Sequence, residues 1–446
     1  MSNIGFGEIT LERVLNQANL KEAYKTVVSN KGAPGVDGMR VDDLLEHIRN
    51  HPYELTQLIR DGKYRPSPIR RVYIPKDNGE QRPLGIPTVI DRLVQQSVAQ
   101  VLSEEYEKVF SENSFGYRPN RGAHDAILKA QWYINNGREW VIDMDLSKFF
   151  DTVNHSKLLQ LLSDRIKDGR VISLIHKFLK APISENGKVG KKTTIGTPQG
   201  GCISPILANI LLNELDQLLD QRGIPFCRYA DDMLILCGSK AAAERILLKV
   251  TKFIEEKLFL KVNKEKTKIG RVSTRTQFLG FGFTKRVTKT RRDSNPKGQK
   301  WFTTTHQKKR DKFIKSVKEI LDRRAPGGIE ATKRKLRWEI QGWVAYFTNS
   351  IPLTWRNEVD SWIRRRIRQL YWKQWKKPQK RFEEFNKRWS KAPALGEYAY
   401  SSRSYWRMAR THQIHMALSN EVLDEEGWFT IERAMGYLPW INMGVP

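Results

Sequence analysis

The sequence predicts an α+β body followed by a helical, positively charged appendage. Patterns typical of strands and of helices alternate as far as residue 283, whereas residues 306–376 have mostly helical periodicity. Charge changes in the same part of the chain, because residues 301–390 hold 24 Lys or Arg against 9 Asp or Glu. Eleven of the 13 tryptophans also lie at or beyond Trp301. These differences indicate two regions with different tasks.

The first region begins with helices and a hairpin. Apolar residues at helical spacing predict helices within residues 8–60, interrupted by a loop at 30–40 that contains three glycines and a proline. IRRVYIP (69–75) and RPLGIP (82–87) are typical of strands and flank the polar turn 76–81. This arrangement predicts a β-hairpin with basic residues at its tip.

Helices and strands continue to alternate through the rest of the first region. The predicted elements are a helix at 90–110, a strand at 140–146, a helix after the turn PQGGCISP, a hairpin of FCRYA and MLILCG, a helix at 240–259 and a strand at 278–283. The polar stretch TKTRRDSNPKGQK follows this strand and reads as a linker.

The composition limits the class of partner. A net charge of +29 and a pI near 9.9 favour a polyanion, most commonly nucleic acid. No apolar run of about 18 residues is present, so we expect no membrane partner. The three cysteines lack C-x-x-C spacing and the N-terminus lacks a secretory signal, so we expect a cytoplasmic protein without a zinc site.

Asp231 and Asp232 stand at the bend of the predicted hairpin, between two apolar arms. Burying an unpaired carboxylate costs several kcal/mol, so the pair needs a turn at the surface, cationic partners or a metal. A surface turn is the ordinary reading of an isolated Asp-Asp pair. A third acid, Asp145, follows the strand at 140–146, and carboxylates brought together in this way can bind two Mg²⁺ ions.

Five motifs in order resemble the fingers and palm of reverse transcriptases. They are VIDMDLSKFFDTVNH, GTPQGGCISPILANILLN, RYADDMLIL, LKVNKEKTK and QFLGFGF, of which RYADDMLIL resembles the Y-x-DD box. The resemblance implies a right-hand polymerase with an antiparallel palm sheet, followed by an α-helical thumb.

The similarity is closer to proteins encoded by bacterial group II introns. It rests on NKGAPGVDG (30–38), YRPSPIRRVYIPK, QGWVAYF (341–347) and WIRRRIRQLYWKQWKKP (362–378). YWRMARTHQIHMALSNEVLDEEGW (405–428) resembles the tail of the subgroup without an endonuclease. The implied domains are an N-terminal extension (1–62), fingers and palm (63–290), a linker (291–304), a thumb or maturase domain (305–382) and a short basic DNA-binding-like region (383–446).

The resemblance assigns the catalytic metal site. Asp145, Asp231 and Asp232 would hold two Mg²⁺ ions, with Leu146 as a further contributor to the metal site. Asp143 is a rival of Asp145, because residues i and i+2 of a strand share a face. Asp145 is preferred because the family pattern places an aromatic residue and a second aspartate after four residues, which Phe150 and Asp151 fit.

The resemblance also assigns a nucleotide site. Its expected members are Lys76, Arg82, Lys148, Phe149, Phe150, Gln199 and Gly200. Lys76 and Arg82 would hold the triphosphate, although a solvated charged turn is the alternative. Phe150 would exclude a 2′-hydroxyl and select dNTPs, although plain core packing is the alternative.

Primer and template contacts are expected in two places. Tyr229 and Gly280 would support the primer end. The basic helices would grip template and primer phosphates, which fixes register without reading sequence; the expected residues are Arg364, Arg365, Arg366, Arg368 and Lys373. The alternative is that these helices present solvated charged faces and that most of their tryptophans are core.

The resemblance implies an RNA-directed DNA polymerase in the bacterial cytoplasm that copies RNA into cDNA and assists the splicing and mobility of its intron RNA. The implied partners are template and intron RNA, a DNA primer or target, and dNTPs. Three alternatives stay open: a splicing factor with incidental polymerase activity, an RNA-directed RNA polymerase, and a domesticated reverse transcriptase in phage defence.

Overall fold

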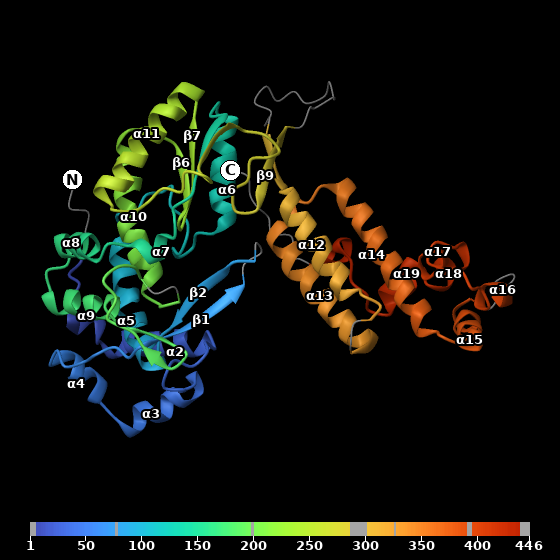
Figure 1. Cartoon of the computed structure of the whole chain (residues 1–446), viewed down its shortest axis with the longest axis horizontal. Helices are drawn as coiled ribbons and strands as arrows, with labels where there is room; N and C mark the ends of the chain where they lie inside the picture. Colours follow the sequence, from blue (N-terminus) through green and yellow to red (C-terminus); the bar gives the residue numbers. More distant parts are fainter. Residues whose placement is uncertain are drawn as a thin grey trace. The chain divides into compact units, whose positions relative to one another are not determined.

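The computed structural model describes residues 6–75, 79–197, 200–285, 301–324, 327–389 and 395–437 (Figure 1). The chain forms two compact units, Met1–Val272 and Ser273–Pro446. Two of the predicted nucleotide-binding residues, Lys76 and Gln199, lie outside the described residues.

Short helices build the N-terminal part of the first unit, as the apolar spacing predicts. They are α1 (Leu11–Val14), α2 (Gln17–Ser29), the 3-10 turn η1 (Val41–Asp43), α3 (Leu44–Asn50) and α4 (Glu54–Arg60). Helix α2 packs on α5 (Val89–Tyr106), which confirms the helix predicted at 90–110. Helix α5 starts where it does because the Thr88 hydroxyl accepts the Asp91 backbone N–H at its first turn.

The fingers contain the predicted hairpin. Strands β1 (Ile69–Pro75) and β2 (Gln81–Ile86) pair antiparallel. The sheet order is β2-β1-β4-β5, and β4 (Ile183–Glu185) joins β1 in parallel. Strands β4 and β5 (Lys188–Val189) have only three and two residues, too few to show an alternating pattern in the sequence.

The predicted antiparallel palm sheet is confirmed, with the order β6-β7-β3-β8. Its strands are β3 (Trp140–Met144), β6 (Phe226–Tyr229), β7 (Asp232–Cys237) and β8 (Lys268–Arg271). All residues of β7 from Met233 onward are buried, although successive side chains point to opposite faces. Both faces of β7 are therefore covered, and α11 (Lys240–Lys257) and α6 (Ala123–Asn135) pack against it.

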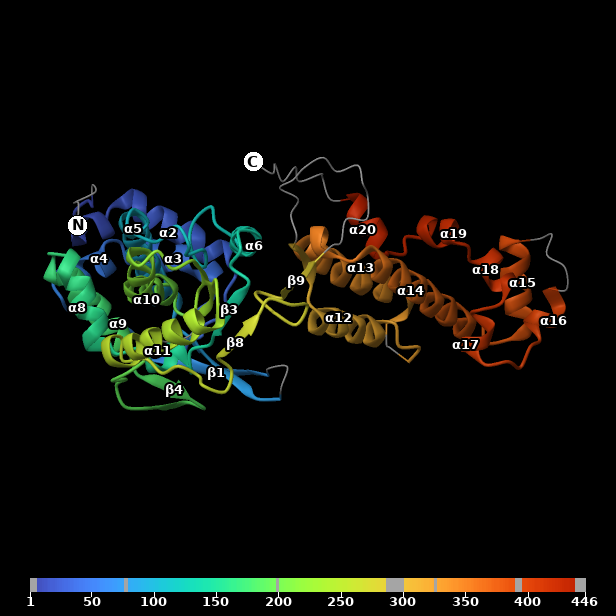
Figure 2. The same ribbon diagram turned by 90° about the horizontal axis from the view of Figure 1, so that it is seen from above.

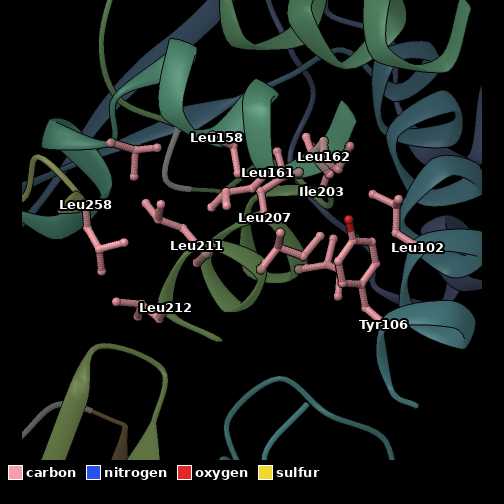
Figure 3. Packing of buried hydrophobic residues seen from close by; sticks show 14 of the residues in the cluster. Leu102, Tyr106, Leu158, Leu161, Leu162, Ile203, Leu207, Leu211, Leu212 and Leu258 are labelled. Atoms are coloured by element: carbon pink, nitrogen blue, oxygen red, sulfur yellow. The ribbon is translucent and has the colours of Figure 1, made fainter. Parts of the chain in front are cut away.

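A leucine-rich cluster joins the helices beneath the sheet. The helices are α8 (His155–Arg165), α9 (Gly169–Leu179) and α10 (Ser204–Gln221). Figure 3 shows Leu158 and Leu162 of α8 beside Leu207 and Leu211 of α10, and all four are buried. Full burial of one leucine contributes about 1.5–3 kcal/mol, so this cluster holds α10 firmly in the first unit.

The second unit begins with a two-stranded sheet of β9 (Phe281–Lys285) and β10 (Trp301–Thr305). The linker predicted at 291–304 is therefore wrong over its last four residues, because WFTT pairs with β9 and buries Trp301. The basic segment is helical as predicted: α12 (Gln307–Ile320), α13 (Gly328–Phe347), the turn η2 (Thr348–Ser350) and α14 (Leu353–Gln374) (Figure 2).

The C-terminal tail consists of short helices that share a core with α12–α14. They are α15 (Pro378–Arg388), α16 (Leu395–Ala399), α17 (Tyr405–Met408), α18 (His412–Ala417), α19 (Asn420–Glu425) and α20 (Ile431–Tyr437). The boundary predicted at 382/383 falls inside α15. None of the helices in the described ranges combines the length and the apolar content that a bilayer crossing requires.

Candidate active site

The predicted Asp-Asp bend is a two-residue hairpin loop. Tyr229 pairs with Asp232, so Ala230 and Asp231 form the connection between β6 and β7. Ala230 has φ +59°, in the left-handed region, which costs a non-glycine residue roughly 1–2 kcal/mol. The surrounding structure must therefore hold this turn in place.

Asp145 comes to the same place from β3. Met144 lies opposite Met233, so the next residues along the two strands are Asp145 and Asp232. The backbone of Asp145 is fixed on its other side: its carbonyl accepts the Asn263 N–H at 2.9 Å. The neighbouring Leu146 forms a bridge with Val262 and is buried. Two strand ends thus present the three predicted aspartates together.

These carboxylates act on one another electrostatically. Burial raises the pKa of Asp232 to about 6, and Asp231, Asp143 and Asp145 add like-charge repulsion. Burial also raises the pKa of Asp231, and the Arg82 guanidinium opposes that rise. The rival acid Asp143 belongs to the same field, since burial and then Asp145 raise its pKa to about 6. Bound cations would relieve this repulsion.

The donor set suits a metal ion that is completed by substrate. In the part of the chain that the structure describes, no three His, Cys, Asp or Glu side chains converge closely enough to hold a metal ion by themselves. Mg²⁺ usually takes one or two protein carboxylates and fills its shell with water and substrate phosphates. The exposed Lys266 ammonium lies 3.7 Å from Asp145 Oδ2 and supplies some local positive charge.

A cavity of about 250 Å³ lies beside the predicted nucleotide residues. Its lining includes Arg71, Gly85, Phe150, Asp151 and Thr197. Phe150 is buried, its ring centroid is 5.1 Å from that of Phe149, and its carbonyl accepts the Thr197 N–H at 2.7 Å. Phe150 therefore has a fixed position in the wall of this cavity.

Two further predicted residues have unusual backbones. Lys148 is exposed, has φ +47° and precedes the short helix α7 (Phe149–Thr152). Gly200 has φ +115°, and a Cβ there would lie 2.5 Å from the Gly85 carbonyl oxygen. The close approach expected of Gly200 is thus made to the fingers hairpin, which carries Arg82 on the same strand as Gly85.

The predicted primer residues fall in different units. Tyr229 adjoins the aspartates in the first unit, whereas Gly280 belongs to the second. Gly280 has φ +87°, and a Cβ there would lie 3.3 Å from Phe347 Cζ. The local packing therefore accounts for glycine at this position.

The thumb arginines differ in what they contact. Arg368 is only 3% exposed and donates to the Leu418 carbonyl and to Asn420, so the prediction that it grips phosphate is wrong. Arg368 lies on the face of α14 that packs against the C-terminal tail, where Leu418 and Asn420 contact it. Arg366 and Lys373 donate to backbone carbonyls near the end of α12, at Leu321 and Arg323 respectively.

Arg364 and Arg365 remain the better candidates for phosphate contacts. Arg364 lies 3.5 Å from the exposed carboxylate of Glu432, and Arg365 stacks on Trp406 with 4.9 Å between Cζ and the ring centroid. Trp372 and Trp375 are buried, in agreement with the core reading of the thumb tryptophans.

Sequence reasoning missed two residues beside the aspartates. Tyr117 is 52% exposed; burial raises its pKa, with Asp231 as the next cause, so its hydroxyl lies in the field of the site. Arg228 precedes Tyr229 and is almost fully buried. The sequence could have pointed to Arg228, because it is a cation inside an apolar strand. No sequence feature pointed to Tyr117.

Comparisons with known proteins agree with this geometry. Residues 74–283 match the family described as reverse transcriptase (RNA-dependent DNA polymerase), and residues 310–389 match the group II intron, maturase-specific domain. Protein YkfC of Escherichia coli (strain K12) is 37% identical over 311 residues, which cover 60% of this chain and 81% of YkfC.

Two other relatives have informative names. The group II intron-encoded protein LtrA of Lactococcus lactis subsp. cremoris is 33% identical over 327 residues, 58% of this chain and 54% of LtrA. The protein named nuclear intron maturase 2, mitochondrial, of Arabidopsis thaliana is 22% identical over 278 residues, 44% of this chain and 38% of that protein. The chain belongs to the reverse transcriptases with a maturase domain that group II introns encode, a family of RNA-directed DNA polymerases.

Proposed function

We propose that Asp145, Asp231 and Asp232, with the backbone of Leu146, hold two Mg²⁺ ions at which a primer is extended by dNTPs on an RNA template. When bound, the ions would stabilise charge on the attacking and leaving oxygens of an in-line phosphoryl transfer. The convergence of two palm strand ends carries this proposal, because it brings acidic side chains into one field.

The chain's own residues would bind and orient the nucleotide. Arg82 lies on β2 and already acts electrostatically on Asp231, so a triphosphate bound at the aspartates would come within its field. Lys76 would be the second cation of this pair. Lys148, Phe149 and Gln199 would complete the nucleotide site around the cavity that Phe150 lines.

The second unit would bind nucleic acid without reading its sequence. Its stretch 301–390 holds 24 Lys or Arg against 9 Asp or Glu, and Arg364 and Arg365 stay partly exposed on α14. We assign to this surface the intron RNA and the primer–template duplex, with DNA as primer or target. Splicing assistance and intron mobility would follow from that binding.

Primer extension on an RNA template tests the metal site. Wild-type protein with Mg²⁺ should extend with dNTPs, and Asp231→Asn should lower the rate on the order of 10³-fold, equivalent to several kcal/mol of transition-state stabilisation. Asp164→Asn, at the exposed end of α8, is the matched control and should extend normally. Extension by Asp231→Asn at the control rate would refute the assignment.

Sugar selection tests the gate. Phe150→Ala should incorporate rNTPs at a rate closer to that for dNTPs, because a smaller wall leaves room for the 2′-hydroxyl. Phe178→Ala, which removes a buried ring of the same core cluster outside the proposed nucleotide site, controls for loss of packing. Incorporation of rNTPs by the wild type would indicate an RNA-directed RNA polymerase instead.

A further inference from the structure

Arg228 is a buried cation beside the active site, and each of its three guanidinium nitrogens donates a hydrogen bond. Arg228 is 1% exposed, and its partner Asp216, on α10, is 0% exposed. Arg228 Nε donates to both Asp216 carboxylate oxygens at 2.8 and 3.0 Å, and Nη2 donates to Oδ2 at 2.5 Å. The two charges thus compensate each other where an unpaired ion would be strongly unfavourable.

The remaining donors of Arg228 hold the catalytic turn. Nη1 donates to the Ala230 carbonyl at 2.9 Å and to Asn209 Oδ1 at 2.9 Å, and Nη2 donates to Ser114 Oγ at 2.8 Å. The Ala230 carbonyl belongs to the peptide unit that leads into Asp231. Arg228 therefore fixes the plane of that peptide, in a turn whose Ala230 has the unfavourable φ of +59°.

A second set of contacts, from residues 113–116, holds the same turn. Arg228 exchanges backbone hydrogen bonds with Asn113 and Phe115, both at 2.9 Å. A Cβ on Gly116 would lie 2.3 Å from the Ala230 nitrogen, so the two backbones are in direct contact. Asn209 Nδ2 donates to the Gly116 carbonyl at 2.9 Å. Asn209 therefore ties Arg228 and this segment to α10 at once.

We propose that Arg228 is a positioning residue for the metal-binding carboxylates: its guanidinium fixes the Ala230–Asp231 peptide and so sets where Asp231 and Asp232 stand relative to Asp145. The inference rests on the proposed function, which assigns the metals to these aspartates. Lysine cannot replace it fully, because a point charge can keep the pairing with Asp216 but not the fork that also reaches Ala230, Asn209 and Ser114.

Arg118 offers a matched control of the same chemistry. Its side chain is 1% exposed, it pairs with Glu107 through Nε and Nη2, and Nη1 donates to the Ser111 and Ser114 carbonyls. It braces the neighbouring segment, since its hydrogen bonds go to Glu107, Ser111 and Ser114 and not to the hairpin residues 229–232. Arg118→Lys therefore tests loss of a buried fork without loss of the turn contact.

The decisive measurement is the Mg²⁺ dependence of primer extension by the full chain. Arg228→Lys should raise the Mg²⁺ concentration for half-maximal rate about fivefold or more and lower the maximal rate about 10- to 100-fold, the scale of an approximately 1 Å misplacement. Mn²⁺, which binds a given oxygen and nitrogen site at least as well, should return part of the rate. Arg118→Lys should lower thermal stability and leave the Mg²⁺ curve within about twofold of wild type.

Two results would overturn the inference. One is an Arg228→Lys protein with lower stability but an unchanged Mg²⁺ curve per folded molecule, which would make Arg228 structural only. If Arg228→Lys does not fold, Asn209→Ala carries the test, since it keeps the Arg228–Asp216 pair and loosens the fork. An unchanged Mg²⁺ curve for Asn209→Ala would then be the second overturning result.

Asp231→Asn in the same assay separates this inference from the proposed function. If Asp231→Asn retains activity, the metal assignment itself fails. If Asp231→Asn is inactive while the Arg228 variants keep the wild-type Mg²⁺ curve, only the positioning role fails.

Discussion

The two units bury an arginine in different ways. In the palm, Arg228 faces a buried carboxylate, and its donors fix the turn that carries Asp231. In the second unit, Arg368 donates to neutral acceptors, the Leu418 carbonyl and the Asn420 side chain. Burial, followed by repulsion from Arg364 and Arg365, lowers the pKa of Arg368 to about 10. The palm compensates its buried charge, whereas the thumb keeps an excess of positive charge around it.

This difference matches what each unit must do: the palm must hold side chains in exact positions, and the second unit must attract nucleic acid. A compensated ion pair fixes geometry strongly, which suits a site where carboxylates must meet metal ions. An excess of positive charge attracts phosphate over a wide area, which suits binding to a nucleic-acid backbone. Mutations in the palm should therefore change stability and the response to metal ions. Mutations in the second unit should change the salt-dependent affinity for nucleic acid.

Breaking the palm pair should have the largest effect. Asp216→Ala leaves Arg228 buried without its carboxylate and should lower the free energy of unfolding of the first unit by about 3–5 kcal/mol. Hydrogen exchange of the amides of β6 and β7 during urea unfolding measures this locally. The double variant Arg228→Met with Asp216→Leu should regain most of that stability without regaining activity; recovery of both would contradict the comparison.

The next largest effect should be the change in stability with pH that the active-site carboxylates cause. Although Asp143 and Asp232 remain exposed, partial desolvation of their carboxylates raises the pKa of both to about 6 from 3.8, so the folded protein binds more protons than the unfolded chain between these values. Stability of metal-free protein should thus fall as pH rises through this window and level off above it.

Mg²⁺ should reverse this loss only where the carboxylates are ionised. At about 100-fold excess over its dissociation constant it should add about 2.7 kcal/mol at pH about 7.5 and much less at pH about 5. Melting curves with EDTA and with Mg²⁺ check the difference. Asp232→Asn serves as control and should lose most of the pH dependence of the Mg²⁺ effect; an equal Mg²⁺ effect at both pH values would count against the site.

Replacing the thumb arginine should cost less than breaking the palm pair. Arg368→Met loses hydrogen bonds to Leu418 and Asn420, worth about 1 kcal/mol each, but also removes a buried charge whose hydrogen bonds go to neutral acceptors. We expect the free energy of unfolding of the second unit to fall by about 1 kcal/mol. Tryptophan fluorescence during denaturant unfolding measures this change. If Arg368→Met lowered the free energy of unfolding as much as Asp216→Ala does, the two buried arginines would not differ as described.

Removing one thumb surface contact should have the smallest effect. Arg365→Ala should weaken RNA affinity about two- to fivefold and reduce the salt slope of log K by about 0.7–0.9, as one phosphate contact does. Filter binding at several salt concentrations measures both quantities. Arg324→Ala, which removes an exposed arginine that pairs with Asp322, is the control; an unchanged slope for Arg365→Ala would exclude a phosphate contact there.

Much of the catalytic geometry could be predicted from the sequence because it is local. The loop between β6 and β7 was recognisable from two aspartates between apolar arms, and Asp145 from its place at a strand end. Short strands such as β4 and β8 were not recognisable, because three or four residues give no periodicity.

The role of Arg228 could not be predicted for another reason. Its partners Ser114, Asn209 and Asp216 are distant in sequence, and only the tertiary structure brings the segment around Ser114 and helix α10 to Arg228. The same holds for Arg368: helical periodicity places it on α14, but only the tertiary structure shows that the tail covers it.

The shared core of thumb and tail limits how this region can be divided. Trp428 Nε1 donates to the Tyr371 hydroxyl at 2.9 Å, and Asp360 accepts the backbone N–H groups of Ile431 and Glu432 at the start of α20. Phe385 and Ile414 belong to the same buried cluster as Ile367. The maturase domain and the tail are therefore one folding unit, and a chain cut at residue 382 would lose part of its own core rather than shed an accessory module. Domain exchange between relatives would have to move both parts together.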